Sequence, residues 1–494
     1  MYSSIRIASR NTPLAKVQTY LVYNELRKLK TIKQLDISFR DTPEVTSQSS
    51  VQELISANFK KDLKSDSIDL AVHSHKNLDL ETSYDTEVVS VLRRADQRDI
   101  ILLKKSSLLN PPNSFSIFSS YPRKEKNYYQ FLKEYSPISL RNKDFTFHTI
   151  QGSITSRIEK WEASGDGIIL AKGSLDYLLL DNYPQADEED IKLTREYIKK
   201  MLQQSHFIVV PLSQCPSDPG QGGIALEFKK GRRDLQNIAN ALSIYTVREE
   251  IEQEREEAKI AGNSIQVSYL KRGYGTVIFK KGITPEGNTI THQELKTSHQ
   301  PKAIAISRVY PIPEETRKNI RKPLEGISHP PEGNLFLIKK NSWLSHWEKN
   351  DVNGILWTAY LSTFKALTDN DFWVSGCSDG LGEEEDPNLN AYLPKSNFIK
   401  LSHTNSSTVP SRYERFATYS LKLNSFPDLR ERTHFFWMSG FQFDTAINKY
   451  PQIVNGYHAS CLGITRNYIQ KKVKAPVDTF LTYEDWYNYH ITFK

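Results

Sequence analysis

The first 230 residues alternate between short apolar runs and stretches with apolar residues at helical spacing. Runs such as "SIRIAS" and "IDLAVHS" have the length expected of buried strands. The stretch "NTPLAKVQTYLVYNELRKL" has helical spacing, with Thr12 as the expected N-cap and Pro13 as the first helical residue. This alternation predicts α/β units, in which helices cover a sheet.

The same pattern divides this part of the chain into two domains. "DFTFHTI", "IEKWEAS" and "GIILAKG" predict a second strand–helix–strand unit, and "HFIVVPL" predicts a strand that returns to the first. We therefore expect one α/β domain over 1–104 and 205–230, and another over 105–204.

A smaller α+β domain is expected over 231–283. Residues 232–259 have helical spacing with a break near Ser243, and "NSIQVSYLK" and "GTVIFKKG" predict two strands. The next residues, 284–300, are polar and rich in turn-forming residues, which predicts a linker.

A repeat is visible in the last part of the chain, 301–494. "ILWTAYLSTFKAL" (355–367) and "FFWMSGFQFDTAI" (435–447) align without a gap and pair Trp357 with Trp437. Each predicts an aromatic strand, a small polar turn and a helix. Two similar α/β lobes facing a cleft would explain the repeat, and a chance similarity of two strand–helix units is the alternative.

Composition narrows the class of protein. With 38% hydrophobic and 25% charged residues, the chain is typical of soluble globular proteins. No apolar segment has the length of a signal peptide core or of a membrane span, so we expect a cytoplasmic protein. The three cysteines, Cys215, Cys377 and Cys461, lie far apart without metal-ligand spacing, which argues against a disulfide framework and against a metal site.

Several strand–helix junctions carry small or basic residues where free backbone N–H groups bind anions. These are "SRNTP" (9–13), "SSYPRK" (119–124) and "QGSITSR" (151–157). Together with Lys76 at a strand end they predict a cleft for carboxylates or phosphates, although each alone could be an ordinary helix cap. The net charge of +7 fits a polyanionic small-molecule ligand, and a solvated surface excess explains it equally well. No nucleic-acid partner is expected.

Seven segments of the N-terminal part resemble hydroxymethylbilane synthase (porphobilinogen deaminase), in the same order and with similar spacing. They are "IRIASRNTPLAKVQ", "IDLAVHSHKNL", "RRADQRDIILL", "SSYPRK", "IQGSITSRIEKW", "GIILAKGSL" and "DPGQGGIALE". The resemblance covers roughly 1–280. It implies two-lobed α/β domains like those of periplasmic binding proteins, followed by a small α+β domain.

This resemblance implies that porphobilinogen units are joined head to tail with loss of ammonia. The growing chain would be held on a dipyrromethane cofactor, attached by a thioether to a cysteine. Basic and hydroxyl side chains would bind the substrate's acetate and propionate groups. The positions concerned are Arg10, Ser74, Lys76, Ser119, Ser120, Arg123 and Arg157.

Two positions depart from the family in ways that affect the chemistry. The family's catalytic aspartate aligns with Asn77, and the cofactor cysteine aligns with Ser264. In the family, loss of ammonia leaves a cationic azafulvene, which the aspartate stabilises. An amide offers this cation no negative charge, which should cost roughly 100-fold or more in rate. A serine hydroxyl is a far weaker nucleophile than a thiolate. We therefore expect no covalently attached cofactor.

Basic residues of the family are also replaced. Its paired arginines align with Pro122 and Arg123, and a Lys-Arg pair aligns with Asp176 and Tyr177. Further replacements fall at Gln151, Ser47 and Gln52. So many changes predict a cleft that no longer runs the family reaction in the usual way.

The region 301–494 resembles uroporphyrinogen-III synthase through its two strand–turn–helix units and "LGITRNYIQKK". The resemblance implies a two-lobed α/β region that closes hydroxymethylbilane into a ring and inverts its last pyrrole. Candidate contacts are Thr358, Tyr360, Ser439 and Thr465, each of which could equally be a helix cap.

The leading hypothesis is thus a fusion of two consecutive enzymes of tetrapyrrole synthesis, with porphobilinogen-derived tetrapyrroles as ligands. The second activity is expected more than the first. Two alternatives stay open for the N-terminal part: an inactive module that binds tetrapyrrole or a partner, and a two-lobed solute-binding protein. The sequence predicts no oligomeric state.

Overall fold

The computed structural model forms two compact units. Unit 1 comprises 1–131, 143–272 and 277–293, and unit 2 comprises 132–142, 273–276 and 294–494. The structure describes residues 4–41, 58–80, 84–260, 265–283, 287–297, 304–316, 319–383, 385–393, 397–406, 413–423 and 425–491.

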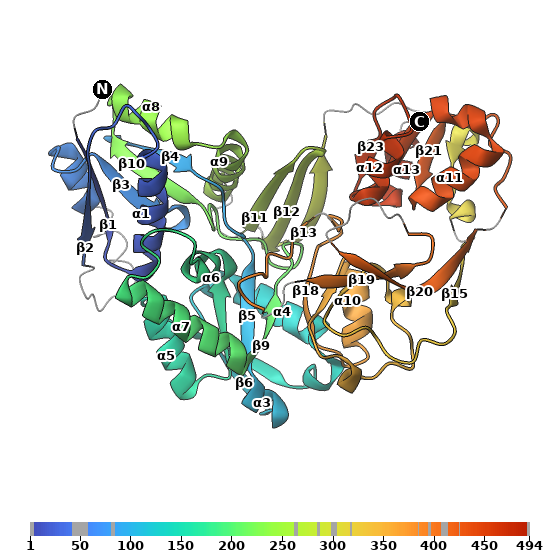
Figure 1. The fold of residues 1–494 in the computed structure, drawn as a ribbon, viewed down its shortest axis with the longest axis horizontal. Coiled ribbons are helices and arrows are strands. Elements are labelled where there is room, and N and C mark those ends of the chain that lie inside the picture. Colours follow the sequence, from blue (N-terminus) through green and yellow to red (C-terminus); the bar gives the residue numbers. More distant parts are fainter. Residues whose placement is uncertain are drawn as a thin grey trace. The chain divides into compact units, whose positions relative to one another are not determined.

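The first sheet of unit 1 has the strand order β2-β1-β3-β10-β4. Its strands are β1 (Ile5–Arg10), β2 (Leu35–Arg40), β3 (Leu70–Ser74), β4 (Thr86–Val91) and β10 (Ile224–Lys229). Strands β1, β2 and β3 are parallel, and β10 runs antiparallel between β3 and β4. Helix α1 (Pro13–Leu26) packs against this sheet (Figure 1). Its predicted start is confirmed, because the Thr12 side chain accepts a hydrogen bond from Ala15 N and Pro13 begins the helix.

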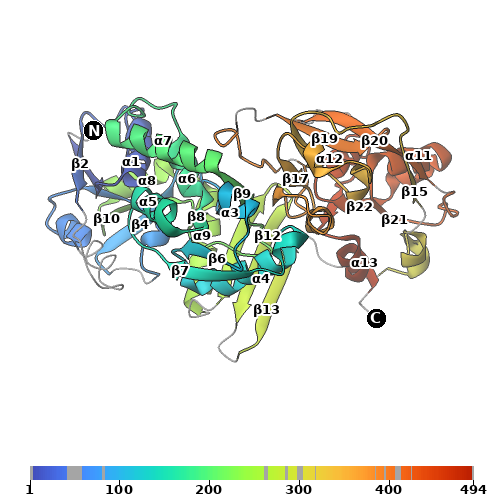
Figure 2. The ribbon, with the colours of Figure 1, turned by 90° about the horizontal axis from the view of Figure 1, so that it is seen from below.

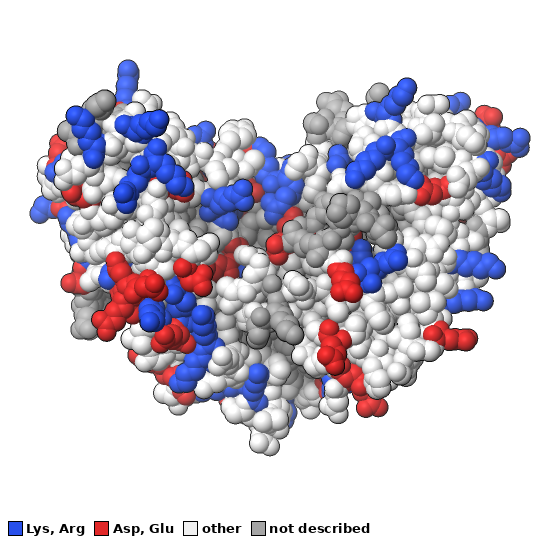
Figure 3. Space-filling view, viewed as in Figure 1, with Lys and Arg blue, Asp and Glu red and all other residues white. Residues whose placement is uncertain are grey.

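The second sheet of unit 1 has the strand order β9-β5-β8-β6-β7. Its strands are β5 (Asp99–Lys104), β6 (Ser114–Ser119), β7 (Asp144–Thr149), β8 (Gly167–Ala171) and β9 (Ser205–Val209). Its helices are α3 (Lys105–Leu109), α4 (Glu125–Tyr135), α5 (Ile154–Ser164), α6 (Lys172–Leu179) and α7 (Glu189–Gln204). Helices α5, α6 and α7 lie side by side (Figures 1 and 2). Acidic and basic side chains are interspersed over α7 (Figure 3), as on a solvated helix face.

A small α+β part follows, with α8 (Arg233–Leu242), α9 (Tyr245–Ile260) and a sheet β11-β12-β13. The predicted break near Ser243 is confirmed, since this residue separates the two helices. The third strand, β13 (Thr289–Lys296), differs from the prediction, because it lies within the expected linker 284–300. Strand β13 is mostly exposed at the sheet edge, so its sequence "TITHQELK" lacks the apolar alternation of a half-buried strand. Strands β11 and β12 span Ile265–Arg272 and Gly275–Ile283.

Unit 2 contains two parallel sheets, which we call lobe A and lobe B. In lobe A the strand order is β15-β20-β19-β16-β17-β18, and in lobe B it is β14-β21-β22-β23. The strands of lobe A are β15 (Asn319–Pro323), β16 (Asn334–Leu337), β17 (Leu356–Thr358), β18 (Val374–Cys377), β19 (Phe398–His403) and β20 (Glu414–Leu423). Those of lobe B are β14 (Val309–Tyr310), β21 (His434–Trp437), β22 (Tyr457–Cys461) and β23 (Asp478–Phe480). Strand β15 is the exception in lobe A, since it pairs antiparallel with β20.

Both predicted strand–turn–helix repeats are present, as β17 with α10 (Leu361–Thr368) and β21 with α11 (Gly440–Lys449). The paired tryptophans make similar contacts. The indole N–H of Trp357 donates to Ser378 Oγ at 3.0 Å, and that of Trp437 donates to His458 Nδ1 at 2.9 Å. In each repeat the strand's tryptophan is therefore fixed by a hydrogen bond to a residue at one end of the next strand.

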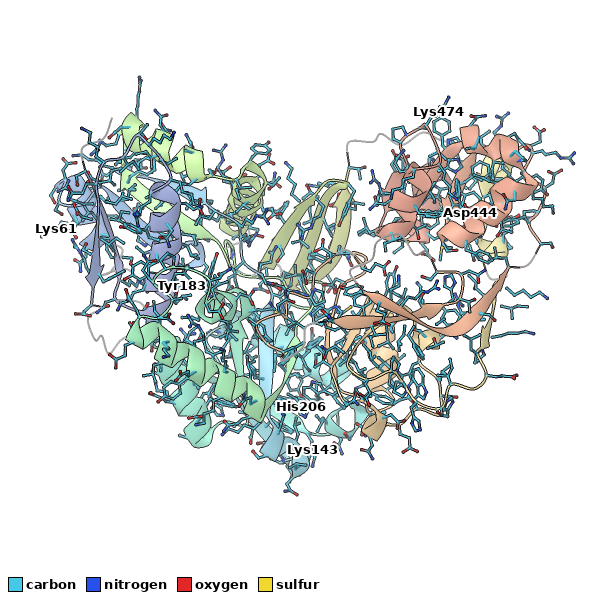
Figure 4. The ribbon with its side chains drawn as sticks, in the orientation of Figure 1. Lys61, Lys143, Tyr183, His206, Asp444 and Lys474 are labelled. Atoms are coloured by element: carbon cyan, nitrogen blue, oxygen red, sulfur yellow. The ribbon has the colours of Figure 1, made fainter. Side chains whose placement is uncertain are left out.

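Alternate residues of β21 build two cores in lobe B. Phe435 and Trp437 pack with α11 and α12 (Ile464–Gln470), whereas Phe436 packs with Trp486 of α13 (Tyr483–Ile491). An ion pair ties α11 to the end of α12, with Lys472 Nζ 2.6 Å from an oxygen of Asp444, which Figure 4 labels. In the part of the chain that the structure describes, no helix has the length and apolarity needed to cross a bilayer.

Candidate functional site

Strand β3 in unit 1 ends beside a cluster of cations and a tyrosine. After Ser74 the chain forms a 3-10 helix, His75–Asn77, which carries Lys76. Lys76 Nζ donates to Tyr121 Oη at 3.0 Å, and it also lies 5.0 Å from the centre of that ring. Because Tyr121 follows β6, the end of one sheet and the end of the other meet here.

Two arginines carry the anion-binding potential of this region. Burial lowers the pKa of Arg157, whose charge also interacts with Tyr121, and its Nε donates to Gly152 O at 2.9 Å. Burial likewise lowers the pKa of Arg10 at the end of β1. Among the described residues neither guanidinium forms an ion pair with a carboxylate. Desolvated cations without a counterion favour binding of an anion.

Of the other predicted substrate contacts of unit 1, three serines form hydrogen bonds within the protein and one arginine is exposed. Ser74 Oγ donates to Gln18, Ser119 Oγ accepts from Tyr121 N, and Ser120 Oγ donates to Ile150 O. These hydroxyls therefore shape the strand ends. Arg123 is exposed, and within the described residues it has no ion pair.

Asn77, at the family's aspartate position, is half-buried beside Lys76. Its amide makes no hydrogen bond within the described part of the chain. The neighbouring His75 is buried, and burial lowers the pKa of its imidazole to about 3. The strand end thus presents an ammonium and a neutral amide, and it offers no carboxylate to a cation at Asn77.

The residues at hand do not fit a thioether-linked dipyrromethane. Ser264 lies outside the described residues, and it carries a hydroxyl. Cys215, the cysteine of unit 1, is fully buried, and burial raises the pKa of its thiol to about 12. Such a thiol is inert as a nucleophile. The other two cysteines, Cys377 and Cys461, belong to unit 2.

Asp176 and Tyr177, which align with the family's Lys-Arg pair, form hydrogen bonds within the protein. Asp176 accepts a hydrogen bond from Lys172 Nζ at 2.8 Å, and Asp96 lies 3.3 Å from the same ammonium. Tyr177 Oη donates to Gly222 O at 2.9 Å. Lys172 is fully buried. The ammonium of Lys172 is therefore neutralised by carboxylates of the protein.

Sequence reasoning missed a second neutralised lysine. Lys124 is fully buried, its Nζ lies 2.5 Å from Asp99 Oδ2, and Tyr128 Oη donates to the same oxygen at 2.8 Å. The ammonium also lies 4.9 Å from the Tyr121 ring. In the sequence, Lys124 stands in the polar run "PRKEK", which is typical of a surface turn and gives no signal of burial.

In unit 2 the predicted residues lie at the carboxyl ends of parallel strands, where ligands of open α/β sheets bind. Thr358 ends β17, and its hydroxyl is buried without a hydrogen-bond partner among the described residues. Tyr360 is the N-cap of α10. Ser439 is the N-cap of α11 and accepts a hydrogen bond from Gln442 N at 3.2 Å, and Thr465 lies half-buried in the first turn of α12.

Lobes A and B touch at a pair of glycines. A side-chain carbon on Gly382 would lie 2.8 Å from Gly463 Cα, and both residues have positive φ angles. Gly463 directly precedes α12, and Gly382 follows the turn after β18. The strand ends of the two lobes are therefore held close together. Across the described residues, no cluster of side chains could hold a metal ion.

Comparison with known proteins shows what the N-terminal region is similar to. Residues 5–237 match the family described as "Porphobilinogen deaminase, dipyromethane cofactor binding domain". The porphobilinogen deaminase of Rickettsia typhi is 28% identical over 266 residues, which cover 52% of this chain and 78% of that protein. Residues 5–237 are thus similar to the cofactor-binding domain of porphobilinogen deaminases. The first part of the resemblance is confirmed, and the uroporphyrinogen-III synthase part stays a prediction.

Two further relatives agree with this. The porphobilinogen deaminase of Caldicellulosiruptor saccharolyticus is 27% identical over 232 residues, 46% of this chain and 69% of that protein. The probable porphobilinogen deaminase of Sulfurisphaera tokodaii is 30% identical over 176 residues, 35% of this chain and 56% of that protein.

Among solved structures, substrate binding domain 2 of GlnP from Lactococcus lactis is 12% identical and covers 53% of this chain and 91% of that chain. Its TM-score is 0.26, which is too low to support a conclusion. The expected α/β fold class is confirmed by the sheets and helices of the structure itself.

Proposed function

We propose that this protein acts in tetrapyrrole synthesis, as a fusion of a deaminase-like unit 1 and a cyclising unit 2. Unit 1 binds the carboxylates of porphobilinogen-derived pyrroles and does not polymerise porphobilinogen at the family's rate. Unit 2 closes hydroxymethylbilane and inverts its last ring. The porphobilinogen deaminase domain supports the pathway, and the repeated lobes of unit 2 support the second activity.

The observation that carries the first half is the chemistry at the end of β3. Lys76, Arg10 and Arg157 remain available to carboxylates, as binding requires. Polymerisation additionally requires an anion close to the developing azafulvene cation, and Asn77 supplies a neutral amide there. The position that aligns with the family's cofactor cysteine carries the hydroxyl of Ser264. Binding and elongation are therefore separated.

The second half rests on the strand ends of lobes A and B. Hydroxymethylbilane loses its hydroxyl readily, so the protein needs to hold the chain bent and to shield the reactive end. Hydroxyls at Thr358, Tyr360, Ser439 and Thr465 can orient pyrrole and carboxylate groups at these strand ends. The unpartnered hydroxyl of Thr358 favours a hydrogen bond with a ligand.

The purified full chain provides the test. Its intact mass should equal that of the sequence, without a dipyrromethane adduct, and it should release ammonia from porphobilinogen roughly 100-fold or more slowly than a deaminase of the family. Hydroxymethylbilane supplied by a separate deaminase should give the ring-inverted uroporphyrinogen, separated from the uninverted isomer by chromatography. An adduct with ammonia release would overturn the proposal for unit 1.

The competing function is a non-catalytic module that binds tetrapyrrole or a partner. The neutralised lysines Lys124 and Lys172 favour this alternative for unit 1 alone, because both are withdrawn from ligand binding. If the full chain neither releases ammonia nor cyclises hydroxymethylbilane, the module hypothesis replaces the proposed enzyme.

A further inference from the structure

A half-buried lysine of lobe A has no part in the contacts described so far. Lys339 lies two residues beyond Leu337, the last residue of β16. Strands β16 and β17 are parallel with Leu337 opposite Thr358, so Lys339 and Tyr360 leave the same edge of the sheet at matching positions. Lys339 Nζ lies 4.1 Å from the centre of the Tyr360 ring.

The ammonium of Lys339 has lost water without gaining a counterion. Burial lowers its pKa. Within the described residues it forms neither a hydrogen bond nor an ion pair, and the ring of Tyr360 is its contact. The carboxylate of Glu383, whose charge acts on Tyr360, is already engaged, because its oxygens lie 2.7 and 3.0 Å from Lys400 Nζ. A half-buried cation in this state favours an external anion.

A second cation acts on Lys339. The positive charge of Arg321, an exposed residue on β15, further lowers the pKa of Lys339. In the described part of the chain Arg321 has no carboxylate partner either. Two like charges near one another are stabilised when one anion lies between them.

The subsite also faces the second lobe. Burial raises the pKa of the Cys461 thiol, at the end of β22, to about 11, and the charge of Lys339 opposes this rise. The Gly382–Gly463 contact lies beside Cys461 in the chain. Lys339 therefore stands at the meeting point of the strand ends of lobes A and B.

We propose that Lys339 and Arg321 form a carboxylate-binding subsite of unit 2, which takes an acetate or propionate group of the linear tetrapyrrole. The inference rests on the proposed cyclisation and names the contact that would hold the substrate's acidic side chains. A lysine that only stacks on Tyr360 for stability is the competing explanation.

The test compares neighbouring lysines. Lys339→Met removes the charge at similar length, Lys340→Met removes the charge of the exposed next residue, and Lys339→Arg keeps the charge. The KM and kcat for hydroxymethylbilane are measured with each variant. The Kd for uroporphyrin, which has eight carboxylates, and for its octamethyl ester is measured by quenching of tryptophan fluorescence.

Lys339→Met should raise both the KM for hydroxymethylbilane and the Kd for uroporphyrin roughly 10-fold or more, with the ester unaffected. Lys340→Met should match the wild type, and Lys339→Arg should restore most of the affinity. Arg321→Gln should act in the same direction as Lys339→Met, with Lys322→Met as its control. Unchanged KM and Kd in Lys339→Met, even with reduced stability, would overturn the subsite.

The two hypotheses fail in different ways. If the wild type cyclises and Lys339→Met behaves normally, the subsite is wrong and the proposed function stands. If the wild type does not cyclise but binds uroporphyrin through Lys339, the function is wrong and the subsite stands. If binding of the acid and of the ester is equal in all variants, no carboxylate subsite exists.

Discussion

Thr358 and Lys172 both carry a buried polar group, but in the part of the chain that the structure describes only that of Lys172 has partners. The ammonium of Lys172 has two carboxylates within 3.3 Å. The hydroxyl of Thr358 has no partner among the described residues, although the residue is fully buried. An unsatisfied buried hydroxyl costs about 1–3 kcal/mol, so a ligand contact is a physical reason to retain it.

Thr358→Val should therefore separate stability from function. The variant keeps the shape of the side chain and removes the unpaired hydroxyl, so the free energy of unfolding should stay the same or rise by about 1 kcal/mol. The cyclisation rate should fall. Urea unfolding and turnover of hydroxymethylbilane measure the two effects.

Thr368→Val is the matched control, because the Thr368 hydroxyl donates to Lys365 O at 3.1 Å. This control should lose stability and keep turnover. A destabilised Thr358→Val variant with normal turnover would show that the hydroxyl is structural.

At this scale, motifs in the sequence could predict Lys76, Arg10 and Arg157, because these residues follow strand and helix signals directly. The partners of Lys172 and Lys124 could not be predicted in the same way. Their carboxylates depend on how strands, turns and helices pack, as when Lys124 meets Asp99 from another part of the chain. A replacement such as Asp176 signals a lost cation, and the structure adds that it neutralises one.

Helix α9 illustrates how a single ion pair organises elements around a site. Arg94, which follows β4, forms two hydrogen bonds with Glu254 of α9, at 2.9 and 2.7 Å. The same carboxylate accepts from Gly220 N and from Tyr269 N of β11. The Arg94 and Glu254 side chains are 5% and 0% exposed, so this network excludes water.

Glu254→Gln should destabilise unit 1 by about 2–4 kcal/mol, because it removes the nearer of two carboxylates from the buried Arg94 and leaves only Glu250, at 3.5 Å. Glu256→Gln, on the exposed face of the same helix, should change the free energy of unfolding by less than about 0.5 kcal/mol. Guanidinium unfolding followed by circular dichroism measures both variants. Equal, small losses in the two would mean that the pair contributes no net stability.

Predictions of helices and strands were correct where cap residues, turn residues or a clear apolar period mark the element. The start of α1 and the break at Ser243 follow from cap and turn residues. Helix α7 could also have been found, because its buried residues Ile191, Arg195 and Ile198 have helical spacing. Strand β13 could not, since an exposed edge strand needs pairing with β12 and little apolar surface of its own.

For the whole molecule, the sequence could predict the α/β class of both the N-terminal and the C-terminal part. It could not predict which strands pair across long separations, such as β14 with β21. Parallel pairing joins segments far apart in the chain, so the local pattern carries no information about the partner. The contact of Gly382 with Gly463 also joins residues far apart in the chain, so the local sequence pattern could not predict it either.

The whole molecule should also lose stability in mild acid. Burial lowers the pKa of His458 and of His403 to about 4, and that of His75 to about 3. His458 Nδ1 accepts the indole N–H of Trp437, so it must be unprotonated in the folded state. The unfolded chain binds protons at these residues below a pH of about 6.5, whereas the folded chain resists until about 4.

The free energy of unfolding should therefore be level above pH 7 and decline between about pH 6.5 and 4, by up to about 3 kcal/mol for each of these histidines. His458→Asn retains an acceptor for Trp437 and removes one titrating group, so the decline should become shallower by about one proton. His346→Asn changes an exposed ring and should keep the wild-type slope. Urea titrations at pH 7.5, 6 and 5, with tryptophan emission as the signal, measure the slopes. An unaltered slope in His458→Asn would mean that acid destabilises the protein through other groups.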